Sequence, residues 1–253
     1  MPRPHLTVET VQELVGETVY DPYGRVLGQL VSFESDVDGT VLKLVVENER
    51  KEIEFLDSGA VVLDDGRIVA LPDWKRLANN VIASYKRALA RMKGLEEMYS
   101  RGEIPGNIYH EFSRKLSASL EKLKKESKQL KAMITQRMHE IEDANLRLDK
   151  AIASLKISYI ANEISDKAYK VAVERLRSAK DSNMRELEDL KTTKARIEAL
   201  ESGSIRIGRE KHAAKPVEKK EERHEAPAAP AKPAPQAPSM EGLQPIPVKL
   251  IEG

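Results

Sequence analysis

Leu120-Glu-Lys-Leu-Lys-Lys-Glu-Ser-Lys-Gln-Leu-Lys-Ala-Met-Ile134 lies at the centre of the stretch that decides the fold. In and around this stretch, apolar residues recur in steps of three and four. This spacing, sustained over about seven heptads, predicts one long helix of a left-handed coiled coil. Polar residues interrupt the seam at Ser127, Arg137 and Asn145, and we expect them to set its register. The apolar residues that recur in steps of three and four are Tyr109, Phe112, Leu116, Leu120, Leu123, Leu130, Ile134, Ile141, Leu148, Ile152, Leu155 and Tyr159.

Two shorter helices are predicted on either side of this one. Breaks around Gly102 and Pro105 and a second corner near residue 163 give helices over about 73–101, 106–160 and 166–201. The two corners repeat each other at an offset of sixty residues, with Tyr99 and Tyr109 matched by Tyr159 and Tyr169. We expect the shorter helices to fold back along the middle one, with the tyrosines packing the corners. The seam can close within one chain or between two.

The first seventy residues have a different pattern, of short strands separated by turns. Strands are predicted at 18–20, 26–34, 40–47, 51–55, 61–63 and 67–71, with turns at Asp21-Pro-Tyr-Gly24, Val37-Asp-Gly-Thr40 and Asp64-Asp-Gly66. About six strands in so few residues favour a small barrel or a strongly curved sheet.

Leu14-Val-Gly-Glu-Thr-Val-Tyr-Asp-Pro-Tyr-Gly-Arg-Val-Leu-Gly28, followed by Leu42-Lys-Leu-Val-Val46, resembles the PRC-barrel family. The resemblance rests on the turn from Asp21 to Gly24 and on Leu27-Gly28 at the start of the second strand. It implies an adaptor domain and does not fix a function. The predicted fold is therefore α+β: a small all-β PRC-type barrel (1–72), a three-helix coiled-coil stalk (73–202), a disordered linker (203–239) and a C-terminal peptide (240–253).

Composition excludes several classes of protein. The chain has no cysteine, so disulfides, thiolate zinc sites and cysteine nucleophiles are excluded. No apolar run approaches the roughly 20 residues of a membrane span, and the N-terminus lacks a signal-peptide pattern, so we expect a cytoplasmic protein. The histidines are scattered and Gly-rich phosphate loops are absent. We predict a protein that is not an enzyme and has no cofactor, metal site or catalytic residue.

Charge is strongly polarised along the chain. Residues 1–72 carry six Lys/Arg against fourteen Asp/Glu, a net of −8, whereas residues 73–202 carry 27 against 20, a net of +7. A basic cluster within the long helix has two interpretations: a solvated coiled-coil face, or a contact with phosphates of DNA or an anionic membrane surface. No aromatic residues interleave it, so base readout is not expected. The cluster consists of Lys122, Lys124, Lys125, Lys128 and Lys131.

The last ten residues contrast with what precedes them. Residues 215–238 are rich in Lys, Glu, Ala and Pro, a composition that does not fold. Alternating apolar residues and two prolines then appear in the tail, Gln244-Pro-Ile-Pro-Val-Lys-Leu-Ile-Glu-Gly253. This pattern predicts a strand that completes a sheet on another molecule. The predicted partner-binding residues are Pro245, Ile246, Pro247, Val248, Lys249, Leu250 and Ile251.

The order of barrel, coiled coil, linker and β-type tail resembles the CdvA family of archaeal cell-division proteins over the whole chain. The resemblance implies a polymerising scaffold, present at mid-cell and peripheral to the membrane. It also implies that the tail recruits the winged-helix domain of a CdvB-like ESCRT-III homologue. The implied assembly comprises dimers and filaments, with DNA or membrane as further partners. Two alternatives stay open: a DNA-associated architectural protein, and a PRC-barrel adaptor for a ribosomal or metabolic partner.

Overall fold

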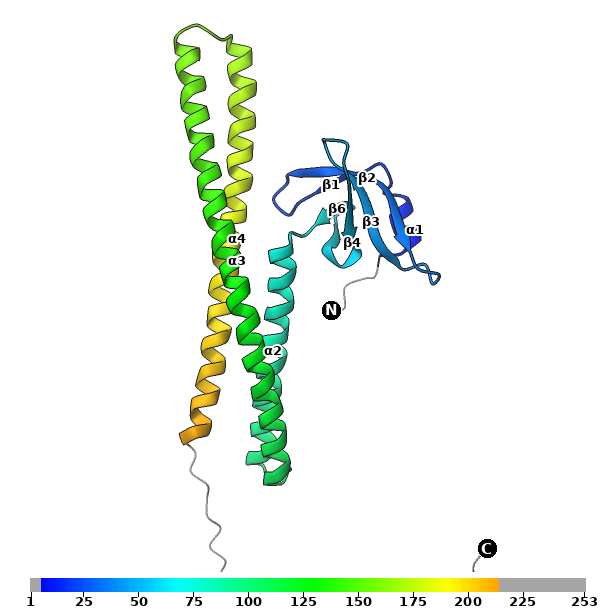
Figure 1. The fold of residues 1–253 in the computed structure, drawn as a ribbon, viewed down its shortest axis with the longest axis vertical. Coiled ribbons are helices and arrows are strands. Elements are labelled where there is room, and N and C mark those ends of the chain that lie inside the picture. Colours follow the sequence, from blue (N-terminus) through cyan, green and yellow to red (C-terminus); the bar gives the residue numbers. More distant parts are fainter. Residues whose placement is uncertain (1–5, 214–253) are drawn as a thin grey trace, which may run out of the picture. The chain divides into compact units, whose positions relative to one another are not determined.

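The computed structural model describes residues 6–213, which form a barrel followed by three long helices (Figure 1). The barrel contains a short helix, six strands and one 3-10 turn: α1 (Val8–Gln12), β1 (Thr18–Tyr20), β2 (Val26–Ser35), β3 (Val41–Glu47), β4 (Ile53–Asp57), η1 (Ser58–Ala60), β5 (Val61–Asp64) and β6 (Arg67–Ala70). The stalk contains α2 (Asp73–Ser100), α3 (Gly106–Ile160) and α4 (Asp166–Ala213).

The six strands form one sheet in the order β4-β3-β2-β1-β6-β5. Neighbouring strands are antiparallel except for β1 and β6, which run parallel. The sheet curves around a core of apolar side chains, among them Val19, Leu30, Val41 and Ile68, each with no measurable exposure. The α+β class and the six predicted strands are therefore confirmed, because alternating apolar residues and turn residues are local signals.

Gly28 explains one feature of the PRC-type motif. A Cβ atom at this position would lie 2.3 Å from the carbonyl oxygen of Glu47 on the neighbouring strand β3. Only glycine lets the two backbones approach this closely. At the preceding turn, the Asp21 carboxylate accepts hydrogen bonds from the backbone N–H groups of Tyr23 and Arg25, at 2.9 and 2.8 Å.

The coiled-coil seam of α3 closes within this chain. Its first half packs against α2 and its second half against α4, and α2 also contacts α4 where the three helices overlap (Figure 1). Leu130 and Ile134 are 3% and 0% exposed in this overlap, where they share a core with Leu190 and Ile197 of α4. The predicted folding back of the shorter helices along the middle one is confirmed.

Each predicted polar interruption of the seam has a partner on α4. Ser127 hydrogen-bonds to Glu201, and Arg137 donates to Glu186 at 2.8 and 3.0 Å. The side-chain amide of Asn183 donates to Asn145 at 3.0 Å. These bonds are spaced along the helix pair and are satisfied together only in one register, because sliding α4 by a turn would leave buried polar groups without partners.

The two corners have matching geometry, as the internal repeat predicts. The rings of Tyr99 and Tyr109 stack at 4.3 Å between centroids, and those of Tyr159 and Tyr169 do so at the same distance. Gly102 and Asn162 occupy the equivalent position with φ of 72° and 59°. The N–H of the residue that follows each one bonds to the carbonyl five residues earlier, at 3.0 and 2.9 Å, as in a Schellman cap.

Helix α4, the last helix of the stalk, is longer than the sequence pattern predicted. It continues to Ala213, whereas the sequence pattern placed the end of the stalk at residue 202. Its last turns are rich in charged residues and glycine, and a helix there carries little apolar periodicity to detect.

Candidate functional site

The tail predicted to bind a partner, Pro245 to Ile251, lies outside the described residues. The basic cluster on α3 lies within them. Lys122, Lys124, Lys125 and Lys128 are all exposed, and Lys122 has Glu126 at 3.9 Å on the same helix. Lys131 differs from the others, because its Nζ lies 2.6 Å from Glu201 Oε2 and it is 26% exposed. The structure therefore leaves four lysines at the surface and engages the fifth in packing α3 against α4.

These four lysines do not line a single narrow stripe. Positions 124 and 128 lie on one side of α3, next to Lys131, whereas positions 122 and 125 lie around the helix from them. Such a spread suits contact with an extended anionic surface more than insertion into a groove. No described helix is long and apolar enough to cross a bilayer.

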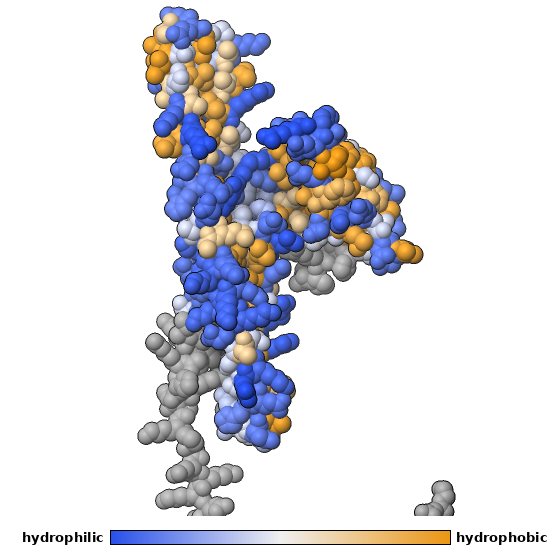
Figure 2. Space-filling view, viewed as in Figure 1, coloured by the Kyte–Doolittle hydropathy of each residue, from blue (hydrophilic) through white to orange (hydrophobic). Residues whose placement is uncertain are grey.

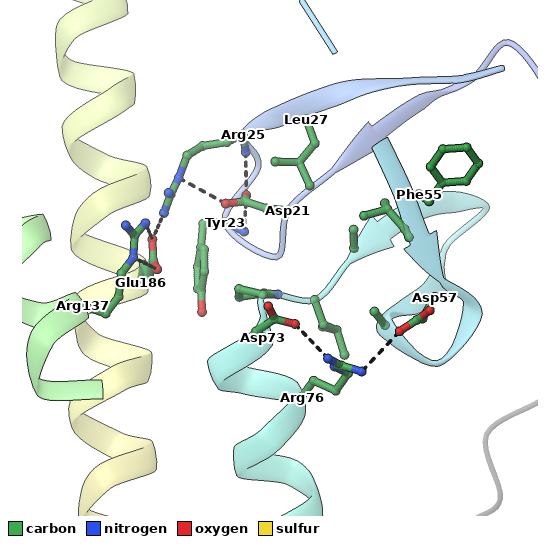
Figure 3. A pocket seen from close by; sticks show the side chains of 15 residues that line it. Asp21, Tyr23, Arg25, Leu27, Phe55, Asp57, Asp73, Arg76, Arg137 and Glu186 are labelled. Atoms are coloured by element: carbon green, nitrogen blue, oxygen red, sulfur yellow. Dashed lines mark hydrogen bonds and ion pairs between the residues drawn. The ribbon is translucent and has the colours of Figure 1, made fainter. Parts of the chain in front are cut away.

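The barrel and the stalk meet at a buried carboxylate that the sequence did not reveal. Glu186 of α4 has a side chain only 2% exposed, between Arg25 of the β1–β2 turn and Arg137 of α3 (Figure 3). Burial alone would raise the pKa of Glu186, but hydrogen bonds from Arg137 and Arg25 hold that pKa below its usual value. This carboxylate is therefore ionised at neutral pH and joins three segments far apart in the sequence.

A second carboxylate, Asp189, lies one turn along α4. Its Oδ2 accepts hydrogen bonds from the Tyr23 hydroxyl at 2.7 Å and from Lys75 Nζ at 2.5 Å. Burial and this bond to Asp189 raise the pKa of Tyr23, so the phenol stays protonated and donates. The Tyr23 ring also belongs to the apolar core of the stalk, which ties the barrel turn to α2 and α4.

A cavity of about 430 Å³ lies beside this junction (Figure 3). Its charged lining is paired internally: Arg25 with Asp21 and Glu186, and Arg76 with Asp57 and Asp73. Among residues 6–213, no group of three or more His, Asp or Glu side chains has a spacing that would hold a metal ion. The arrangement fixes the barrel on the stalk.

The junction residues carried little signal in the sequence. Tyr23 and Arg25 belong to the turn of the PRC-type motif, whose sequence predicts a turn and a family resemblance but no contact with the stalk. Arg137 was recognised as a polar interruption of the seam, but its partner Glu186 is 49 residues away and looks like any surface glutamate of a charged helix. Only the folded packing of α3 against α4 reveals that it is buried.

Comparison with known proteins bears on most of the chain. The model of the CdvA-like coiled-coil domain family matches residues 73–221. The chain belongs to the CdvA-like family. It is 35% identical over 202 residues to the cell division protein A of Sulfolobus acidocaldarius, covering 80% of this chain and 84% of that protein. No solved structure matches the chain. The resemblance drawn from the order of its domains is thus confirmed, and the family is not one of enzymes.

Proposed function

We propose that this protein is a non-enzymatic scaffold of cell division that self-assembles through its stalk and recruits an ESCRT-III homologue through its tail. A role in cell division is supported by membership of the CdvA-like family and by the similarity to cell division protein A over most of both chains. This family relationship is the single observation that carries the proposal. The proposal includes assembly at mid-cell, against the membrane, as the family resemblance implies.

The tail is the proposed recruiting element. Ile246, Val248 and Leu250 alternate with Pro247 and Lys249, so in an extended peptide the three apolar side chains share one face. Such a peptide adds a strand to the open edge of a winged-helix domain on the partner. Backbone hydrogen bonds then supply affinity, and pockets for alternate side chains supply specificity.

Truncation after Ser239 tests this proposal. Each anchoring aliphatic side chain contributes about 1.5–3 kcal/mol on burial, before the cost of ordering the peptide. We therefore expect roughly micromolar binding by the full chain and none by the truncated one, with helix content and self-association unchanged. Calorimetric titration of a purified winged-helix domain of an ESCRT-III homologue measures the affinity, and circular dichroism checks the fold.

Two single substitutions separate sequence-specific docking from nonspecific attraction. Val248→Asp removes an anchor and should abolish binding, whereas Lys249→Ala, on the opposite face, should change the affinity by less than about threefold. Capture of the partner by the truncated chain would place recruitment in the barrel or the stalk.

A second function, binding of an anionic polymer or lipid surface, is favoured by the four exposed lysines of α3. Replacing Lys122, Lys124, Lys125 and Lys128 by Glu should abolish binding to duplex DNA or anionic vesicles. In the unmodified protein, the slope of log affinity against log salt should include about three to four units from these charges. The matched control replaces four other basic residues that are exposed on α3, Arg114, Arg147, Lys150 and Lys156, by Glu. Equal binding by both variants would show that the cluster is only solvated.

A further inference from the structure

Two apolar grooves lie between α2 and α3. One, of about 600 Å³, is near the corner between the two helices, and its apolar lining includes Leu95, Met98, Ile108, Phe112 and Leu116. The other, of about 260 Å³, lies farther from the corner and is lined by residues that include Leu77, Val81, Leu130 and Met133. Four of these side chains are 39–48% exposed although they are large and apolar: Leu77, Met98, Phe112 and Met133.

Both grooves lie on one face of the helix pair, here called the α2–α3 face. On α3, the lining residues follow steps of three and four that continue across Lys122 from one groove to the other, at Ile108, Phe112, Lys115, Ser119, Glu126, Gln129 and Met133. On α2, the steps continue across Arg87, at Leu77, Asn80, Ser84, Arg91, Gly94 and Met98. Residues with this spacing form one stripe along a helix.

Helix α4 does not cover this stripe. Contacts of α4 with α3 in the same region come from Glu201 to Ser127 and Lys131, and from Lys194 to Thr135. These α3 positions lie around the helix from Glu126, Gln129 and Met133. The described part of the chain thus leaves the α2–α3 face open, with an apolar groove near each end and polar side chains between the two grooves.

The two grooves are related by a two-fold symmetry. The stacked rings of Tyr99 and Tyr109 mark residues at the same level on α2 and α3. The midpoint of the α2 stripe lies between Arg87 and Ala88, and the midpoint of the α3 stripe lies between Leu120 and Glu121. Each midpoint is the same number of residues from its tyrosine, so at equal rise per residue the two midpoints are level with each other. A two-fold axis at that level, perpendicular to the helices, would therefore place each groove of one copy opposite the other groove of a second copy. The same axis serves α2 and α3.

We propose that two copies of this chain pair in antiparallel fashion through the α2–α3 face, about this axis. The inference rests on the proposed self-assembly and names the surface that performs it. Across the axis, Ile108 of one copy faces Met133 of the second, and Leu77 faces Met98. Leu77 and Met133 of one groove then cover Met98 and Ile108 of the other, and Phe112 faces Gln129, so that each copy presents the same surface to its partner.

Charge selects the antiparallel arrangement and a second copy as the occupant. Lys115 of one copy faces Glu126 of the second, and this contact occurs twice. Arg91 faces Ser84, and Lys122 faces Ser119. One like-charge contact remains, because Arg87 lies next to the axis and therefore beside Arg87 of the second copy. Parallel pairing would instead bring the two corners together and place Arg91 of one copy beside Lys115 of the other. Opposite charges in register favour the first arrangement, and like charges disfavour the second.

The pairing leaves the α3–α4 corners at opposite ends of the dimer. Ile157 and Ile160 are each 68% exposed there, and Figure 2 shows hydrophobic side chains gathered at this end of the hairpin. A symmetric pair is closed, so growth into a polymer needs a second contact, which these ends offer.

Engineered cysteines test the arrangement directly, because the natural chain has none. Leu77 and Met98 lie on one helix about 30 Å apart and cannot bridge within a chain. We expect an equimolar mixture of Leu77→Cys and Met98→Cys chains to form a disulfide-linked dimer on mild oxidation, while each variant alone does not. Leu146→Cys, 55% exposed on α3 but off the α2–α3 face, measures bridging by random collision.

Charge reversal gives an independent test. Lys115→Glu should weaken dimerisation on the order of tenfold by placing Glu against Glu126 of the second copy, and Glu126→Lys should do the same. The double reversal should restore the wild-type dissociation constant in sedimentation equilibrium. Within one chain these residues are about 16 Å apart along α3, so rescue requires contact between copies.

The outcomes separate this inference from the function on which it rests. A chain that self-associates, yet bridges in the mixture no faster than the Leu146→Cys control and shows no rescue, would refute the α2–α3 face and leave the scaffold proposal standing. That result would mean that the tail or another protein binds the α2–α3 face. A chain that stays monomeric at all concentrations would overturn both.

Discussion

Ile134→Asp should unfold the stalk at temperatures where the unmodified protein is folded. Ile134 has no exposed surface and lies where α2, α3 and α4 overlap. Removing the aliphatic side chain costs about 2–5 kcal/mol, and an unpaired carboxylate in the same place adds several more. The sum approaches the whole stability of an ordinary domain, about 5–15 kcal/mol. Thermal melting followed at 222 nm by circular dichroism should show loss of most of the helical signal.

The control for this substitution is Leu146→Asp, on the same helix. Leu146 is 55% exposed, so the new carboxylate stays hydrated and the melting temperature should change by no more than about 2 °C. Equal effects of the two substitutions would mean that residue 134 is not buried within one chain. Because the seam closes within the chain, we expect Ile134→Asp to lower the stability of the monomer as well as to disrupt assembly.

The sequence predicted the elements well because their signals are local. The strands of the barrel alternate apolar residues between turns such as Asp64-Asp-Gly66, and α3 keeps its three-four spacing along its length. Both patterns report burial of one face within a few residues. The end of α4 at Ala213 was missed because a polar helix there has no apolar stripe to detect.

The contacts between distant segments were beyond sequence reasoning for a different reason. Arg25 and Glu186 each resemble a solvated charge in their own neighbourhood, and Arg137 is visible only as a polar residue of the seam. Only the packing of the barrel turn against α3 and α4 brings the three together. The α2–α3 face is a similar case. The spacing of Lys115 and Glu126 is visible in the sequence, but their complementarity emerges only once the corner has set α2 and α3 level.

A substitution at the barrel–stalk junction should also lower the stability of the protein by a large amount. Glu186→Ala should destabilise the protein by about 3 kcal/mol, because it leaves Arg25 and Arg137 facing each other without their shared carboxylate. Both guanidinium groups are about one-third exposed and can rehydrate, which keeps the loss at the low end for a broken buried pair. Chemical denaturation of the variant measures this loss. Glu188→Ala, an exposed neighbour on α4, is the matched control and should be neutral within about 0.5 kcal/mol.

The same carboxylate predicts a pH dependence with a definite sign. The pKa of Glu186 is lower in the folded chain than its ordinary value of 4.5, because hydrogen bonds from Arg137 and Arg25 outweigh the opposing effect of burial. Its contribution to stability is therefore complete above about pH 4.5 and is lost as the pH falls through the lower, folded-state pKa. Glu186→Gln removes this titration, so its free energy of unfolding should fall less steeply than that of the unmodified protein between about pH 5 and pH 3. Parallel curves for the two proteins over that range would show that Glu186 is not held ionised by the two arginines.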